Sequence, residues 1–257
     1  MNLNVIFGAV LTFFAIYFGA PDIRENFGVY IRPDAFILVI GGTFASTMTG
    51  VSIKEFLGVF KVFKVVIFGA RKKSKPNEVI KVLISVAQSA QSGSKQSLGA
   101  TYKGRNKFLD RALEMVGAGL DKEFINQTLE TDIDELENRH NKMINIVRTM
   151  GSYAPMYGMA GTVIGVVQVL KDVTSIETII GGMSLALLTT LYGLVFTSVL
   201  FIPITNKLKS LSNTEKLANE IIREGILLIM DKEIPLKVEK YLTAYINTAE
   251  KGKFAKK

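Results

Sequence analysis

Four long stretches of the chain contain no charged side chain. A helix needs about 20 residues, rising about 1.5 Å each, to cross the hydrocarbon core of a bilayer. Each stretch is near that length or longer, so the pattern predicts an all-α polytopic membrane protein with four transmembrane helices and a helical cytoplasmic domain. The uncharged stretches are Met1–Pro21, Ala35–Ile53, Thr149–Leu170 and Thr178–Asn206.

These stretches divide the whole chain into spans and cytoplasmic parts. The first stretch has no basic residue ahead of its apolar core, unlike a signal peptide, so we interpret it as a retained span. We expect transmembrane helices at residues 1–21, 35–53, 149–170 and 178–206, a cytoplasmic helical domain at 54–148 and a cytoplasmic tail at 207–257.

Lysine and arginine predict the orientation of the spans. Of the 31 basic residues, 17 lie in residues 54–148 and 11 in residues 207–257, while the two short connections between the other spans hold the rest. Positive residues favour the cytoplasmic side of a membrane. We therefore expect a multi-pass membrane protein with both termini in the cytoplasm. The net charge of +8 follows from this topology and requires no nucleic-acid partner.

Helical spacing of apolar residues continues outside the spans. Lys61 and Lys64 lie one turn apart in an apolar stretch, as in a helix that leaves the membrane with its lysines reaching the headgroups. Gly117 to Gly119 predicts a turn, and we interpret the single histidine, His140, as structural. Helices are expected at residues 56–68, 78–92, 107–116, from near Asp121 into the third span, and at 213–230, followed by a break at Pro235 and a short final helix.

The sequence contains no recognisable catalytic set. Cysteine is absent, which excludes disulfides, thiolate zinc sites and cysteine nucleophiles. There is no phosphate-binding loop, no HExxH motif and no pairing of histidine with a carboxylate at a useful spacing. We therefore expect neither an enzyme nor a protein with a bound metal or cofactor.

Small residues recur on one face of the third and fourth spans. Such faces let membrane helices approach closely, and packing within one chain explains the glycines fully. Packing within one chain is a weaker explanation for the mid-span hydroxyl groups of Thr162, Thr189 and Thr190. These groups either bond their own helix backbone or meet a polar partner. The small residues are Gly151, Ala154, Gly158, Gly161 and Gly165 in the third span, and Gly182, Ala186, Thr190, Gly193 and Thr197 in the fourth.

No Asp, Glu, Lys, Arg or His lies within any of the four uncharged stretches. Ion pathways through membranes normally use an ionisable group of this kind, because it is costly to place there and is kept for function. If this protein moves ions, a second subunit must supply the carboxylate. A protein that worked alone would instead be a membrane scaffold.

Several motifs resemble the MotA/PomA stator proteins of the bacterial flagellar motor, in order and over nearly the whole chain. The third and fourth spans are the most specific part. ExbB and TolQ belong to the same superfamily and share a similar core, but they have three spans and a differently placed cytoplasmic segment. The motifs are Tyr153–Leu170 with Glu137–His140 before it, Leu187–Gly193, Pro203–Leu208, Val39–Thr43 and Glu224–Leu227.

The resemblance implies an A-type stator subunit that forms an ion channel with a B-type, MotB/PomB-like subunit and converts ion flow into torque on the rotor. It implies a complex of five A subunits around two B subunits, whose B helices carry the ion-binding aspartate. The transported cation would be sodium or a proton. The alternatives are an ExbB/TolQ-like energiser of an outer-membrane system and a scaffold without ion coupling.

The resemblance also suggests site residues. Pro155 and Pro203 match two prolines associated with conformational coupling, and Thr190 matches the threonine of the fourth span. Thr162 matches a position that is threonine in sodium-driven members and often alanine in proton-driven ones. With Thr189, these hydroxyl groups would form an oxygen-rich ion pathway, which favours sodium because a dehydrated sodium ion needs several oxygen ligands.

The contact with the rotor protein FliG departs from the family pattern. The family uses an arginine and a glutamate eight residues later, but alignment on Gly93 places Ala90 and Leu98 there, and neither is charged. Nearby charged residues could substitute for them. The candidates are Lys95, Lys103, Arg105, Lys107 and Asp110.

Overall fold

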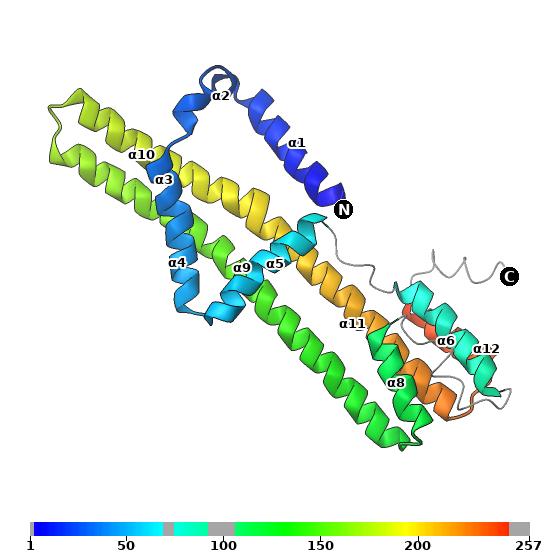
Figure 1. Cartoon of the computed structure of the whole chain (residues 1–257). Coiled ribbons are helices and arrows are strands. Elements are labelled where there is room, and N and C mark those ends of the chain that lie inside the picture. Colours follow the sequence, from blue (N-terminus) through cyan, green and yellow to red (C-terminus); the bar gives the residue numbers. More distant parts are fainter. Residues whose placement is uncertain (1–2, 69–74, 92–105, 247–257) are drawn as a thin grey trace. The chain divides into compact units, whose positions relative to one another are not determined.

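The structure is a computed structural model that describes residues 3–68, 75–91 and 106–246 (Figure 1). Every regular element within these residues is a helix, which confirms the predicted all-α class. The chain divides into two compact units. The first consists of Met1–Ala70 and Asn141–Lys209, and the second of Arg71–His140 and Ser210–Lys257.

Two long helices, α9 and α11, contribute to both units. The elements that begin in the first unit are α1 (Leu3–Gly19), α2 (Pro21–Glu25), η1 (Phe27–Tyr30), α3 (Pro33–Phe36), η2 (Ile37–Gly41), α4 (Gly42–Thr49), α5 (Ile53–Phe68), α10 (Ile176–Val195), η4 (Phe196–Phe201) and α11 (Ile202–Met230). Those that begin in the second are α6 (Pro76–Gln91), α8 (Lys107–Gly117), α9 (Lys122–Lys171), α12 (Pro235–Leu242) and η5 (Thr243–Tyr245).

Three helical stretches among the described residues are long and apolar enough to cross a membrane. They are Phe27–Thr49, Lys122–Lys171 and Ile176–Met230, so the protein is a multi-pass membrane protein. The first helix, α1, is apolar and 17 residues long. A fourth span at this helix stays a prediction.

Polar contacts fix the start of the second predicted span against α10 in the first unit. The Arg32 guanidinium donates to the carbonyl oxygen of Gly181 at 2.7 Å. The Tyr192 hydroxyl donates to the carbonyl of Tyr30 at 2.5 Å and accepts from the backbone N–H of Arg32 at 2.9 Å. Ala35 is fully buried against α10, so apolar packing adds to the hydrogen bonds that join the start of this span to α10.

The second unit has its own apolar core, formed by α6, α8, α12 and the adjoining parts of α9 and α11. Asn106 begins α8 by accepting a hydrogen bond from the backbone N–H of Phe108 at 2.8 Å. Gly119 follows α8 with φ +76°, a left-handed conformation that glycine adopts readily, which confirms the expected turn. Fully or almost fully buried core residues include Ile80, Leu83, Leu109, Ile125, Leu129, Ile222, Ile226 and Leu242.

One helix boundary differs from that expected. The tail helix does not start near residue 213, because α10, η4 and α11 form one helical stretch from Ile176 to Met230. The expected break before a short final helix is confirmed, because α11 ends at Met230 and α12 begins at Pro235, whose missing N–H costs nothing in the first turn. Pro76 begins α6 in the same way. His140 lies in α9, where its Nδ1 is 3.0 Å from the Ser212 hydroxyl.

The small-residue faces of the third and fourth spans meet each other within the chain, on α9 and α10 (Figure 1). A Cβ atom on Gly182 would lie 2.6 Å from the carbonyl oxygen of Gly165, and one on Gly193 would lie 2.7 Å from that of Ala154. The two backbones are therefore in direct contact. Packing within one chain accounts for the glycines, as the first of the two interpretations has it.

We predict that Gly182→Ala destabilises the protein while its neighbour Gly181→Ala does not. The added Cβ at position 182 would collide with the backbone of α9, whereas at position 181 it would meet only the Gln168 amide nitrogen at 3.9 Å. Overpacking of this kind costs about 1–3 kcal/mol. Thermal unfolding of the purified full chain in detergent, followed by circular dichroism, measures the difference. Equal loss of stability in both variants would contradict the backbone contact.

Candidate ion-pathway site

Two of the predicted hydroxyl groups meet at the interface of α9 and α10. The Oγ1 atoms of Thr162 and Thr190 are 2.6 Å apart, and either can be the donor. Both residues are half-buried. Each lies well inside its uncharged stretch, so the contact is placed within the expected membrane region.

Two backbone carbonyls complete this cluster of oxygen atoms. Thr162 Oγ1 is 3.2 Å from the carbonyl oxygens of Gly158, in its own helix, and of Ala186, in α10. Thr190 Oγ1 is 3.2 Å from that of Ala186 and 3.5 Å from that of Gly158. The two carbonyls also accept the backbone N–H groups of their own helices, but each oxygen of the cluster has more than one lone pair, so the cluster can accept further hydrogen bonds or coordinate a cation.

Thr189 makes no contact with the hydroxyls of Thr162 and Thr190. It is fully buried, and its hydroxyl bonds only its own helix, with the Leu185 carbonyl oxygen at 2.8 Å and that of Ala186 at 3.1 Å. Its side chain fills the space beside Gly161, where any Cβ would collide with it. The structure therefore brings together Thr162 and Thr190 and gives Thr189 a packing position.

The hydroxyl pair lies on the side of α9 away from the second predicted span. Tyr157 of α9 faces that span, since its hydroxyl is 2.5 Å from that of Ser46. Thr162 follows five residues later, about 140° around a helix of 3.6 residues per turn. Large exposed apolar side chains border the pair on both helices, among them Met159, Val163, Met183 and Leu187.

Pro155 leaves a carbonyl group without its usual partner in α9. Proline has no N–H, so residue 155 cannot donate to the carbonyl of Gly151 four residues earlier. The hydroxyl of Thr197, in η4, donates to this carbonyl at 3.0 Å. An unpaired carbonyl in the hydrocarbon region is costly, so Thr197 stabilises the helix at the proline. Thr197 stands out in the sequence only as a member of the small-residue face, although Pro155 four residues after Gly151 is the signal of a carbonyl that needs another donor.

Pro203 is accommodated differently. It is the second residue of α11 and directly follows η4, the π-helical segment Phe196–Phe201. A π-helical turn shifts the hydrogen-bond register and is a common way to relieve the loss of a donor at a proline. Both predicted coupling positions thus lie where the regular α-helical bonding pattern changes.

The candidate rotor contacts are only partly described by the structure. Lys95, Lys103 and Arg105 lie outside the described residues. Lys107 is exposed at the first position of α8, and Asp110 is half-buried one turn later. Among the described residues, no group of three or more His, Asp or Glu side chains is placed to hold a metal ion.

The fold and the site together define a helical, multi-pass membrane protein whose closely packed helix pair carries a cluster of uncharged oxygen atoms. Residues 100–221 match the model of the MotA/TolQ/ExbB proton channel family. The motility protein A of Treponema phagedenis is 30% identical over 98% of this chain and 96% of its own length. The chemotaxis protein PomA of Vibrio alginolyticus is 27% identical over 98% of both chains. The chain therefore belongs to the MotA/TolQ/ExbB proton channel family.

Solved structures agree with this assignment. A chain of the flagellar MotAB stator complex from Bacillus subtilis matches with a TM-score of 0.88 and 28% identity, over 98% of this chain and 99% of its own. A chain of C. jejuni MotAB matches with a TM-score of 0.86 and 27% identity, over 96% and 97% of the two chains.

Proposed function

We propose that this protein is the A-type stator subunit of a bacterial flagellar motor. With a B-type subunit it forms an ion channel that converts ion flow into torque on the rotor. The observation that carries this proposal is the near end-to-end match in sequence and fold to motility protein A and to the stator complexes. An ExbB/TolQ-like energiser shares the family, but the full-length relatives named here are motility and chemotaxis proteins.

The absence of charge in the spans assigns complementary roles to the two subunits. The four uncharged stretches offer hydroxyls and carbonyls but no carboxylate. The B-type partner supplies the ion-binding aspartate, and five copies of this chain surround two copies of the partner. FliG is the rotor partner, and the proposed contacts are Lys95, Lys103, Arg105, Lys107 and Asp110. Movement of one elementary charge across a membrane potential of 100 mV releases about 2.3 kcal/mol of free energy, which is several times thermal energy.

The proposed topology places four spans at residues 1–21, 35–53, 149–170 and 178–206 in the inner membrane. Both termini, the segment 54–148 and the tail 207–257 lie in the cytoplasm. This arrangement keeps 28 of the 31 basic residues on the cytoplasmic side.

The stator assignment is tested by deleting the gene and by counting subunits in the purified complex. We expect cells that still carry a flagellum but do not swim, and native mass spectrometry should show five copies of this chain with two of the partner. Complementation with the wild-type gene is the control. Normal swimming combined with a defect in uptake of iron complexes would instead support an energiser, and a stable monomer that ignores the partner would support a scaffold.

The two prolines are proposed to couple ion binding to movement. When the partner aspartate is neutralised, its contacts with the third and fourth spans change, and the A ring steps around the B helices. We predict that Pro155→Ala and Pro203→Ala each abolish swimming while leaving assembly intact. Alanine at 155 would donate an N–H to the Gly151 carbonyl and compete with the Thr197 hydroxyl that now holds it. Swimming assays and native mass spectrometry measure the two effects, and normal motility in both variants would count against coupling.

Sodium is the proposed coupling ion, with the proton as the alternative. A sodium ion in a membrane must replace its lost hydration with several oxygen ligands. The cluster of Thr162, Thr190 and two carbonyls would supply such oxygens beside the partner aspartate. We predict that swimming speed rises with external sodium at fixed pH, and that Thr162→Ala weakens this dependence. Wild-type speed that ignores sodium would rule out sodium coupling without affecting the stator assignment.

A further inference from the structure

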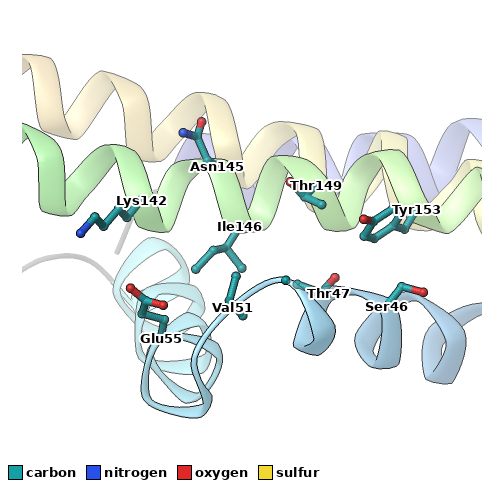
Figure 2. Close-up of a pocket in the computed structure, with 10 residues that line it drawn as sticks. Ser46, Thr47, Val51, Glu55, Lys142, Asn145, Ile146, Thr149 and Tyr153 are labelled. Atoms are coloured by element: carbon teal, nitrogen blue, oxygen red, sulfur yellow. The ribbon is translucent and has the colours of Figure 1, made fainter.

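A cavity of about 340 Å³ lies in the first unit between α9 and the corner that joins α4 to α5 (Figure 2). Glu55 and Lys142 line one end, and Ser46 and Tyr153 line the other. Val51 and Ile146 lie between these ends (Figure 2). The cavity is therefore charged at one end, apolar in the middle and hydroxyl-bearing at the other end.

The two charged groups are not joined to each other. The Ser52 hydroxyl and backbone N–H donate to the Glu55 carboxylate at 2.8 and 3.1 Å, as in a helix-capping box. These hydrogen bonds lower the pKa of Glu55, with a further contribution from the charge of Lys142, so the carboxylate is ionised at neutral pH. Lys142 makes no hydrogen bond or close ion pair with the residues that the structure describes. One fixed carboxylate and one available ammonium thus face the same cavity.

The cavity lies at the level in the membrane where the lipid headgroups are expected. It is bordered by Gly50 and Thr149, at the cytoplasmic ends of the second and third predicted spans. Its charged end lies outside these spans, and its hydroxyl end lies inside them. Helix α5 continues from this corner with exposed Leu57 and Phe60, the pattern of a helix that lies in the membrane interface.

We propose that this cavity binds a zwitterionic phospholipid whose headgroup carries a primary ammonium, as in phosphatidylethanolamine. The lipid phosphate pairs with Lys142, and the lipid ammonium pairs with Glu55. The glycerol ester groups of the lipid then lie beside the hydroxyls of Ser46 and Tyr153, which are deeper in the membrane than the two charged residues. An anionic lipid fits less well, because the fixed carboxylate of Glu55 repels a second negative charge.

The proposal is tested with the full chain reconstituted in nanodiscs of mixed phosphatidylethanolamine and phosphatidylglycerol. After transfer to detergent, native mass spectrometry identifies the lipid retained. We expect wild type to retain phosphatidylethanolamine preferentially and Lys142→Gln to lose retention of both lipids several-fold. Glu55→Gln should lose the preference, because glutamine preserves the cap to Ser52 but removes the negative charge. Lys209→Gln, an exposed position on α11 outside the cavity lining, is the matched control and should behave as wild type.

Two results would overturn the inference. In the first, wild type retains the two lipids in their bulk ratio, or both cavity variants match Lys209→Gln. In the second, lipid appears only on monomers and is absent from oligomers, which would mean that a neighbouring copy fills the cavity. Neither result depends on whether the protein generates torque, because only the membrane location is assumed.

Discussion

The direct contact between the backbones of α9 and α10 is the constraint on which the rest of the membrane unit depends. Helices in a bilayer gain little from burying apolar surface against each other, since lipid tails are equally apolar, so close packing must hold them together. Gly158, Gly182 and Gly193 provide that packing, because a Cβ at each would lie 3.0 Å or less from a carbonyl oxygen of the facing helix. Only at this separation can the short side chains of Thr162 and Thr190 reach each other at 2.6 Å.

The close approach of the helices also provides a hydrogen-bond donor for the carbonyl that Pro155 leaves unpaired. The proline removes the donor for the Gly151 carbonyl, and Thr197 can supply a hydroxyl because η4 lies directly against α9. Gly193 makes room for the proline, since a Cβ there would be 3.1 Å from the Cα of Pro155. Proline, glycine and threonine therefore form one connected arrangement, in which a change in the separation of the helices also changes the bonding of the interrupted turn.

Much of the fold could be predicted from the sequence because membrane insertion and helix periodicity leave strong local signals. The charge-free stretches, the turn at Gly119 and the helix that begins near Asp121 are all of this kind. The surface that packs against each small-residue face could not be predicted, because periodicity identifies the face of a helix but not what covers it. The π-helical segments Ile37–Gly41 and Phe196–Phe201 were also missed, because a π-helical turn has no sequence pattern of its own.

The candidate site shows the same division between local and long-range information. Thr189 and Thr190 are adjacent in sequence, yet one donates to its own helix and packs on Gly161 while the other meets Thr162. A difference of about 100° around the helix axis separates the buried packing position from the position that contacts Thr162. Only the position of α9 determines which of the two threonines occupies each position.

The hydroxyl pair has no charge, but it can serve either sign of charge. A hydroxyl group rotates its proton to suit its surroundings, and Thr162 and Thr190 each have carbonyl acceptors at 3.2 Å as well as each other. With both protons turned to those carbonyls, the two oxygens present lone pairs to a cation. With one proton turned outward, the pair donates to an ionised carboxylate. In the proposed channel, uncharged groups of this kind can interact with the partner carboxylate both when it holds its ion and after the ion is released. A fixed charge would instead favour either the ion-bound or the ion-free state.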